Sequence, residues 1–139
     1  MKQFWILLAV LLPVWILGGC SDTQTRFPVV NELESVTLTV IEDTIKANGA
    51  TFVLTNGTTE EIYYRDAYHM ERKDERDQWN EFVGTANAQW EDTVIYLAAG
   101  ESVELPIDWK NLCGGISAGE YRLILEVNEM PVAVEFMRE

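Results

Sequence analysis

The chain has 139 residues, of which 47% are hydrophobic, so it is long enough for one domain with its own core. The net charge is -13. Lys2 is the only one of the 10 basic residues that precedes Cys20, so the chain from Cys20 onward contains 9 basic residues (10 minus 1) and 23 acidic residues. This balance excludes a nucleic-acid partner, because phosphates require a basic surface. Two cysteines, Cys20 and Cys113, provide no disulfide framework.

The first twenty residues have the features of a secretory signal that ends in a lipid-attachment site. Lys2 precedes an apolar run over residues 4–17, which leads into Leu-Gly-Gly-Cys ending at Cys20. This motif looks like a bacterial lipobox, in which small residues fit the peptidase and the thiol receives the lipid. The run is shorter than the roughly 20 residues of a membrane span. We predict a signal peptide over residues 1–19 and lipidation of Cys20, and the alternative is an uncleaved anchor with an incidental cysteine.

Residues 20–34 are mostly polar and contain one proline. We expect them to form a tether after the lipidated cysteine, and residues 35–139 to form the folded domain. The acyl chains on Cys20 would supply the membrane affinity. The predicted location is therefore extracytoplasmic, at the surface of the bacterial cell membrane.

Short alternating runs begin the domain. Residues 36–40 alternate between aliphatic residues and threonine, which predicts a strand. The turn dipeptide Asn48-Gly49 precedes a second short strand over residues 50–54, and Asn56-Gly57 closes it.

A longer strand is predicted over residues 61–73, which are rich in tyrosine. Alternation would send one half of its side chains inward and place the other half, including His69, on the outer face. A charged hairpin tip at residues 74–77 leads to a strand over residues 78–83, a polar loop over residues 84–92 and a short strand over residues 93–97. In the strand over residues 61–73, the two alternating sets of side chains are Ile62, Tyr64, Tyr68 and Met70 on one face, and Tyr63, Arg65, His69 and Glu71 on the other.

The most regular alternation lies between Gly100 and residue 127. Gly100 opens one strand that Trp109 closes, a crossing with one turn of 3₁₀ helix follows, and Gly119 opens the next strand. A last strand covers residues 132–136. About seven to nine strands without a long helix predict an all-β antiparallel sandwich. In the strand that begins at Gly119, we expect Tyr121, Leu123, Leu125 and Val127 to point inward, and Arg122, Ile124 and Glu126 to point outward.

Several motifs in this region carry a resemblance to a known family. They are Gly-x-Ser-x-Glu from Gly100, Asp108-Trp109, and Ala-Gly-Glu-Tyr-Arg-Leu over residues 118–123, together with the upstream Tyr-x-Met-Glu-Arg-Lys that ends at Lys73. The chain resembles a bacterial immunoglobulin-like (Ig-like) domain of Gram-positive surface proteins and lipoproteins, from about residue 35 to its end. The resemblance implies an Ig-like β-sandwich that is presented outside the cell and has no assigned catalytic residue.

Two aromatic residues in these motifs are expected to fix the sandwich. A buried tryptophan or tyrosine needs a polar partner for its N–H or O–H group. We expect such partners for Trp109 and Tyr121, and we hypothesise that Tyr121 acts like the tyrosine corner of Ig domains.

The inventory of reactive residues is thin. His69 is the only histidine, so a Ser-His-Asp or Cys-His mechanism would have to use it. We interpret it as a structural or surface residue, and Cys113 as a small buried or loop cysteine. One histidine and one cysteine fall short of a zinc site, and the carboxylates form no calcium-loop motif. We expect no enzymatic activity, no metal and no cofactor.

Aromatic residues supply the candidate binding face. The first hypothesis is a non-enzymatic, lipid-anchored module that binds another envelope protein or a cell-wall polymer, through a sheet face or through an edge strand that takes up a peptide. The alternative is a small-molecule or glycan-binding lipoprotein with a concave pocket lined by Trp79, Phe82 and Trp90. The residues of the candidate face are Tyr63, Arg65, His69, Trp79 and Trp90.

Overall fold

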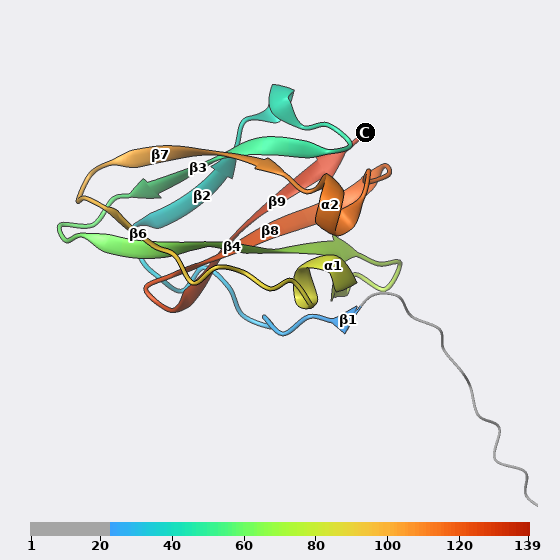
Figure 1. The fold of residues 1–139 in the computed structure, drawn as a ribbon, viewed down its shortest axis with the longest axis horizontal. Helices are drawn as coiled ribbons and strands as arrows, with labels where there is room; N and C mark the ends of the chain where they lie inside the picture. The colour runs from blue at the N-terminus through green and yellow to red at the C-terminus, as the bar shows by residue number, and fades with distance from the viewer. Residues whose placement is uncertain (1–22) are drawn as a thin grey trace, which may run out of the picture.

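Two antiparallel sheets face each other in the computed structural model, which describes residues 23–139 (Figure 1). The smaller sheet has the order β2-β3-β7 and the larger has the order β1-β5-β4-β8-β9, with β6 paired to the other end of β4. The predicted antiparallel sandwich is therefore confirmed. The strands are β1 (Thr23–Gln24), β2 (Val36–Val40), β3 (Gly49–Asn56), β4 (Ile62–Lys73), β5 (Trp79–Glu81), β6 (Val94–Leu97), β7 (Ser102–Asp108), β8 (Gly119–Val127) and β9 (Met130–Arg138).

Helices in the described residues are single turns. They are η1 (Glu42–Thr44), α1 (Val83–Ala86) and α2 (Lys110–Cys113). The turn predicted after Trp109 is thus α-helical rather than 3₁₀, and α1 occupies the start of the expected polar loop. Over residues 23–139, no helix is long and apolar enough to cross a membrane.

Alternation along the strands builds the core between the sheets. Phe52 and Leu54 of β3 are fully buried, as are Leu123 of β8 and Trp109. The ring of Phe136 lies 5.7 to 5.9 Å from the rings of Phe52, Tyr121 and Trp109 (centroid to centroid). The inward positions predicted for β4 and β8 are all buried. These positions are Ile62, Tyr64, Tyr68, Met70, Tyr121, Leu123, Leu125 and Val127.

An irregularity in β4 preserves this alternation. Tyr64 pairs with Val127 and Tyr68 pairs with Leu125, so four residues of β4 span two residues of β8. Because the excess is an even number of residues, the same set of side chains faces the core on both sides of the bulge.

The two expected polar partners are present. Trp109 donates its indole N–H to the carbonyl oxygen of Ala47 at 2.8 Å, which ties the end of β7 to the loop before β3. Tyr121 donates its hydroxyl to the carbonyl oxygen of Ser117, four residues upstream, at 2.6 Å. A buried ring with a hydroxyl bonded to upstream backbone is the arrangement hypothesised for Tyr121.

The described part of the expected tether departs from the prediction. β1 pairs with β5, and Phe27 is only 8% exposed against Ile124 and Ala133. We call residues 24–34 the strap, because they cross the outer face of the larger sheet from β5 to β9. Arg122 and Ile124 do point outward as expected, yet the strap buries them. The polar residues of the strap therefore form hydrogen bonds to the sheet and do not serve as a solvated linker.

We expect Tyr121→Phe to lower the free energy of unfolding by about 1 kcal/mol, because the hydrogen bond from the hydroxyl to the Ser117 carbonyl is lost while the ring still packs. Denaturant unfolding of the full chain measures this. Tyr96→Phe is the matched control, since Tyr96 is 66% exposed. Equal midpoints for the two variants would contradict a structural role for the hydroxyl.

Candidate functional site

The outer face of the larger sheet carries most of the predicted binding residues. Residues that pair directly across antiparallel strands point to the same side, so the registers define rows of side chains that cross the sheet. The first row is Trp79, Lys73, Glu120 and Met137, the second is Glu81, Glu71, Arg122 and Glu135, and the third is His69, Ile124 and Ala133.

A buried ion pair lies in the second row. Arg122 donates from Nε to Oε1 of Glu71 at 2.6 Å, and Glu71 is 0% exposed. The same guanidinium donates from Nη2 to the carbonyl oxygen of Phe27 at 3.0 Å and to Oγ1 of Thr25 at 3.2 Å. Arg122 thus joins β8, β4 and the strap, and its remaining face lies 4.8 Å from the ring centroid of Trp79.

A second buried carboxylate lies directly opposite the first. Glu81 of β5 pairs with Glu71 of β4, and each carboxylate has its own cationic or imidazole partner. Glu81 contacts Nδ1 of His69 at 2.7 Å and Nη2 of Arg26 at 3.3 Å. We call Arg26, His69, Glu71, Glu81 and Arg122 the buried charge network.

His69 therefore occupies a different environment from the predicted one. It is on the outer face, but Glu81 holds one ring nitrogen and the ring of Phe27 covers it with 4.9 Å between centroids. This arrangement attaches the strap to the sheet. It also removes His69 from the exposed candidate face.

Beyond the strap, the outer face carries an exposed cluster at the opposite end of β4. Tyr63 donates its hydroxyl to Oε1 of Glu129 at 3.2 Å, and Arg65 donates from Nη2 to the same oxygen at 3.1 Å. Arg65 also pairs with Asp92, and the ring of Tyr96 lies 6.4 Å from that of Tyr63. We call Tyr63, Arg65, Asp92, Tyr96 and Glu129 the tyrosine patch.

The patch is held in place by backbone contacts as well as by charge. The backbone N–H of Tyr63 donates to the side chain of Asn128 at 3.0 Å, and the N–H of Asn128 returns a bond to the Tyr63 carbonyl at 2.9 Å. Arg65 fixes the positions of both carboxylates, so Tyr63 and Tyr96 are presented on an ordered base.

Hydrogen bonds and charge shift the pKa values of the patch. Donation from Arg65 and then from Tyr63 lowers the pKa of the Glu129 carboxyl below its ordinary value. The hydrogen bond to Glu129 in turn raises the pKa of Arg65. Partial desolvation, followed by the bond to Glu129, raises the pKa of Tyr63. The patch therefore carries one cation between two anions at neutral pH.

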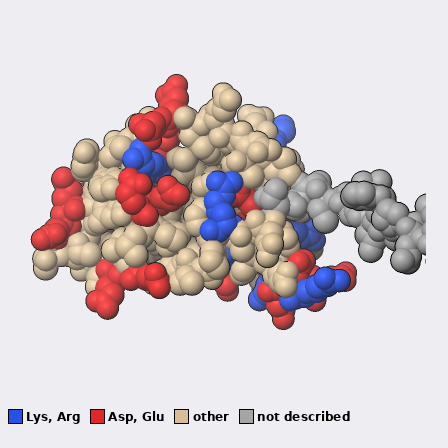
Figure 2. Space-filling model, turned by 90° about the horizontal axis from the view of Figure 1, so that it is seen from below, with Lys and Arg blue, Asp and Glu red and all other residues tan. Residues whose placement is uncertain are grey.

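Figure 2 views the molecule from the side of the strap. Acidic side chains lie around the margins of this face, with fewer basic side chains among them, and no continuous basic area is present on the face drawn. This distribution agrees with the acidic composition.

The fold can now be placed in a family. A family model described as a bacterial Ig-like domain matches residues 32–137, which is more than half of the chain. The chain belongs to this family. No curated protein matches it significantly. The predicted Ig-like β-sandwich is thus confirmed, and the match covers every strand after the strap.

In this Ig-like domain the five predicted face residues do not form one surface. Tyr63 and Arg65 share the tyrosine patch, whereas His69 is covered by the strap. Trp79 lies at the other end of the sheet, against Lys73 and Arg122. Trp90 packs against the core beside Tyr68, with 5.0 Å between ring centroids.

The pocket required by the glycan-binding alternative is not formed by its three named residues. Phe82 stacks on Tyr121 with 6.2 Å between centroids, and Trp90 packs on Tyr68. Trp79 instead lines a groove next to β9. Within residues 23–139, no group of three or more His, Cys, Asp or Glu side chains is arranged to hold a metal ion.

Sequence reasoning missed Tyr96, Asp92 and Glu129. Tyr96 pairs with Tyr63 across β6 and β4, so an exposed position in the predicted strand over residues 93–97 was the available signal. Glu129 lies in the tight turn between β8 and β9, with a backbone φ of 64°. Its contact with Arg65 depends on the pairing of β4 with β8, which the local sequence does not specify.

The buried charge network yields a stability prediction. Arg122→Met leaves the Glu71 carboxylate buried without its partner, which costs about 3–5 kcal/mol of unfolding free energy. Adding Glu71→Leu should recover a large part of this loss, because no unpaired charge then remains. Denaturant unfolding of the full chain measures both effects.

Arg72→Met is the matched control, because Arg72 lies on β4 but is exposed, and it makes only a 3.5 Å contact with the Ala118 carbonyl and a 5.7 Å contact with the ring centroid of Tyr121. The role assigned to Arg122 would be wrong if Arg122→Met cost no more than Arg72→Met.

The patch yields a prediction on pH. A carboxyl with a lowered folded pKa contributes stability above its unfolded pKa, and that contribution is lost as the pH falls through the folded pKa. We expect Glu129 to titrate below its ordinary range in an NMR titration of its side-chain carbonyl, and Arg65→Met to raise that pKa. An unchanged Glu129 titration in Arg65→Met would contradict the assigned contact.

Proposed function

We propose that this chain is a lipid-anchored, extracytoplasmic Ig-like module that binds another envelope protein through the tyrosine patch and has no enzymatic activity. The observation that carries the proposal is the exposed Tyr96, packed against a half-buried Tyr63 beside an Arg65 that two carboxylates hold in place. Tyrosine and arginine are enriched among residues that dominate binding energy at protein interfaces. A tyrosine side chain has only two χ angles, so it loses little conformational entropy when it is ordered at an interface.

Membership in the bacterial Ig-like family supports the proposed extracytoplasmic location and the proposed binding role. Bacterial Ig-like domains are surface-type interaction modules, and the lipobox motif at Cys20 would hold this one at the membrane. Only Ser21 and Asp22 separate Cys20 from β1, and three Cα–Cα steps span at most about 11 Å. The end of the sandwich that contains β1 and β5 would therefore lie close to the bilayer.

The tyrosine patch would then face away from the membrane. It lies near the start of β4, whereas β5 pairs with the end of that strand. Lys73 lies eight positions after Arg65, and because the bulge places four residues of β4 against two of β8, their separation along the strand is roughly 20 Å. A partner in the envelope could reach the patch without displacing the lipid anchor.

Non-enzymatic binding is supported by the surroundings of the single histidine. Glu81 contacts Nδ1 of His69 and Phe27 packs against its ring, which leaves the side chain 14% exposed, and its role in holding the strap accounts for its position. The glycan-binding alternative has less support, because Trp79, Phe82 and Trp90 pack in separate places. Protein recognition therefore explains the exposed side chains better.

The test places a photo-crosslinking amino acid at position 96 of the tagged full chain in native membranes. We expect one envelope protein to crosslink from position 96, with about tenfold less product when Arg65→Ala is added, as for a residue at an interface hot spot. The matched control carries the crosslinker at position 104, because Glu104 is exposed on β7 of the other sheet.

The same preparation tests the anchor. Cys20→Ala should leave the chain unprocessed and without lipid, as measured by mass spectrometry. Equal crosslinking from positions 96 and 104 would contradict the patch. Crosslinking to a cell-wall polymer alone would replace the protein partner with a glycan, and normal processing of Cys20→Ala would remove the lipid anchor from the proposal.

A further inference from the structure

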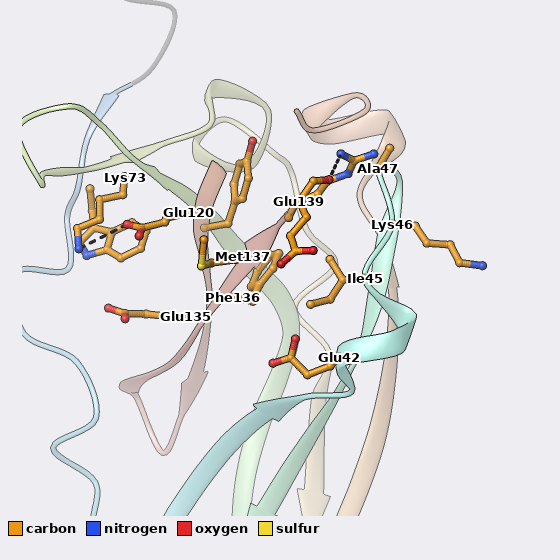
Figure 3. A pocket seen from close by; sticks show the side chains of 13 residues that line it. Glu42, Ile45, Lys46, Ala47, Lys73, Glu120, Glu135, Phe136, Met137 and Glu139 are labelled. Carbon is orange, nitrogen blue, oxygen red and sulfur yellow. Dashed lines mark hydrogen bonds and ion pairs between the residues drawn. The ribbon is translucent and has the colours of Figure 1, made fainter. Parts of the chain in front are cut away.

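A groove of about 840 Å³ lies next to β9, at the end of the sandwich opposite the tyrosine patch (Figure 3). One wall is formed by Glu135–Glu139 and the other by Glu42 and residues 45–47, which connect β2 to β3. Figure 3 shows Phe136 and Met137 on the β9 wall, with Ile45 on the side of Phe136. Ile45 and Phe136 form an apolar part of a lining that also carries several charged side chains, and the volume of the groove is within the range of known ligand sites.

The β9 strand presents free backbone groups along this groove. Asn31 of the strap shows which groups point away from β8: its N–H donates to the Pro131 carbonyl, and its side chain bonds both the N–H and the carbonyl of Ala133. Backbone direction alternates along a strand, so Glu135 and Met137 present their N–H and carbonyl groups on the same edge. Among residues 23–139 no backbone partner reaches either of them.

The strap thus closes the first half of the β9 edge and leaves the second half open. Asn31 has a positive φ of 63° and imitates a neighbouring strand over Pro131 and Ala133 only. An open edge of this kind accepts an extended segment, which gains main-chain hydrogen bonds from the edge and specificity from the side pockets.

The charges around the groove select the kind of segment. Among the cations that line it, Lys73 is engaged by Glu120 at 3.7 Å, and Arg138 donates to the Glu139 carbonyl. Lys46 points away from the groove in Figure 3, whereas the carboxylates of Glu42 and Glu135 lie toward it. Nε of Arg138 is buried without a hydrogen-bond partner, so the charges free at the groove are this guanidinium and the carboxylates of Glu42 and Glu135, which leaves an excess of negative charge.

We propose that the open half of the β9 edge binds an extended segment of another protein in which basic residues alternate with apolar ones, so that the segment adds a strand to the larger sheet. Its main chain pairs with Glu135 and Met137. Its apolar side chains enter the groove toward Ile45 and Phe136, and its basic side chains face the free carboxylates.

A second copy of this chain is a poorer occupant of the same edge. Two antiparallel β9 strands would bring the Glu135 carboxylates of both copies together, and like charges in cross-strand positions destabilise pairing. The net charge of -13 adds long-range repulsion between copies. The proposal is separate from the tyrosine patch, because each site can fail its own test without affecting the other.

The test uses the ¹⁵N-labelled full chain in zwitterionic detergent micelles and three synthetic heptapeptides. The probe is Lys-Val-Lys-Ile-Lys-Val-Lys, and the controls replace every lysine with glutamate or the central isoleucine with proline. We expect the lysine peptide to slow hydrogen exchange at the Glu135 and Met137 amides and to shift their NMR signals in a saturable manner. Neither control peptide should do so at the same concentration.

Two pairs of variants separate the main-chain contact from the charge contact. Met137→Pro removes an edge N–H that makes no bond to β8, which sheet edges tolerate, whereas Met137→Ala keeps that N–H. Glu135→Lys reverses a groove charge, whereas Glu126→Lys makes the same change on β8 outside the groove lining. We expect Met137→Pro and Glu135→Lys each to weaken binding about tenfold relative to its control.

Several results would overturn the proposal. Equal binding of the lysine and glutamate peptides would remove the charge selection. Equal binding by Met137→Pro and Met137→Ala would remove the main-chain pairing, and signal shifts confined to the acidic hairpin at residues 74–77 would show adventitious attraction only. A concentration-dependent dimer in analytical ultracentrifugation that protects the same two amides would assign the edge to a second copy.

Discussion

The position of the strap depends on the guanidinium of Arg122. Its partners are Glu71 on β4, 51 residues away in sequence, and the strap residues Thr25 and Phe27, which are 97 and 95 residues away. Burying two charges is expensive, and a buried pair offsets that cost only when its geometry is good and its other hydrogen-bonding groups are used. Arg122 meets this condition on its own side by bonding the carboxylate and the strap together, whereas Oε2 of Glu71 is buried without a hydrogen-bond partner. Strand pairing and strap position are thereby linked.

That linkage determines which part of the outer face is exposed. Under the strap, Ile124 and Ala133 lose contact with water beneath Phe27, and His69 is held by Glu81. Outside the strap, two surfaces stay accessible at opposite ends of β4. The tyrosine patch is a polar aromatic surface with its charges paired, whereas the β9 groove has an open strand edge and uncommitted carboxylates. The two surfaces proposed as binding sites therefore differ in their chemistry.

The same geometry limits how the domain could be presented at a membrane. A strap that is packed on the sheet cannot act as a spacer, so lipid on Cys20 would keep the β1–β5 end near the bilayer. The acidic hairpin that follows β4 would be near that surface, where repulsion from anionic headgroups would orient the domain rather than attach it. In such an arrangement the acyl chains alone supply the membrane affinity.

Much of the fold was predictable because strand periodicity is a local property. Alternation correctly predicted the inward residues of β4 and β8, and the charged turn at residues 74–77 correctly predicted a hairpin. Trp109 and Tyr121 were correctly expected to be buried with polar partners. The candidate site was predicted less well. Tyr63 and Arg65 lie together, but His69, Trp79 and Trp90 are each held by separate neighbours.

The sequence by itself determined the fold class, the acidic character and the faces of individual strands, because each depends on composition or on neighbours two residues apart. Only the tertiary structure decided that residues 24–34 cover the sheet, that Glu129 reaches Arg65, and that β9 keeps half of its edge open. These features come from contacts between segments far apart in the chain. A pattern that predicts an outward-facing side chain does not show whether another segment lies over it.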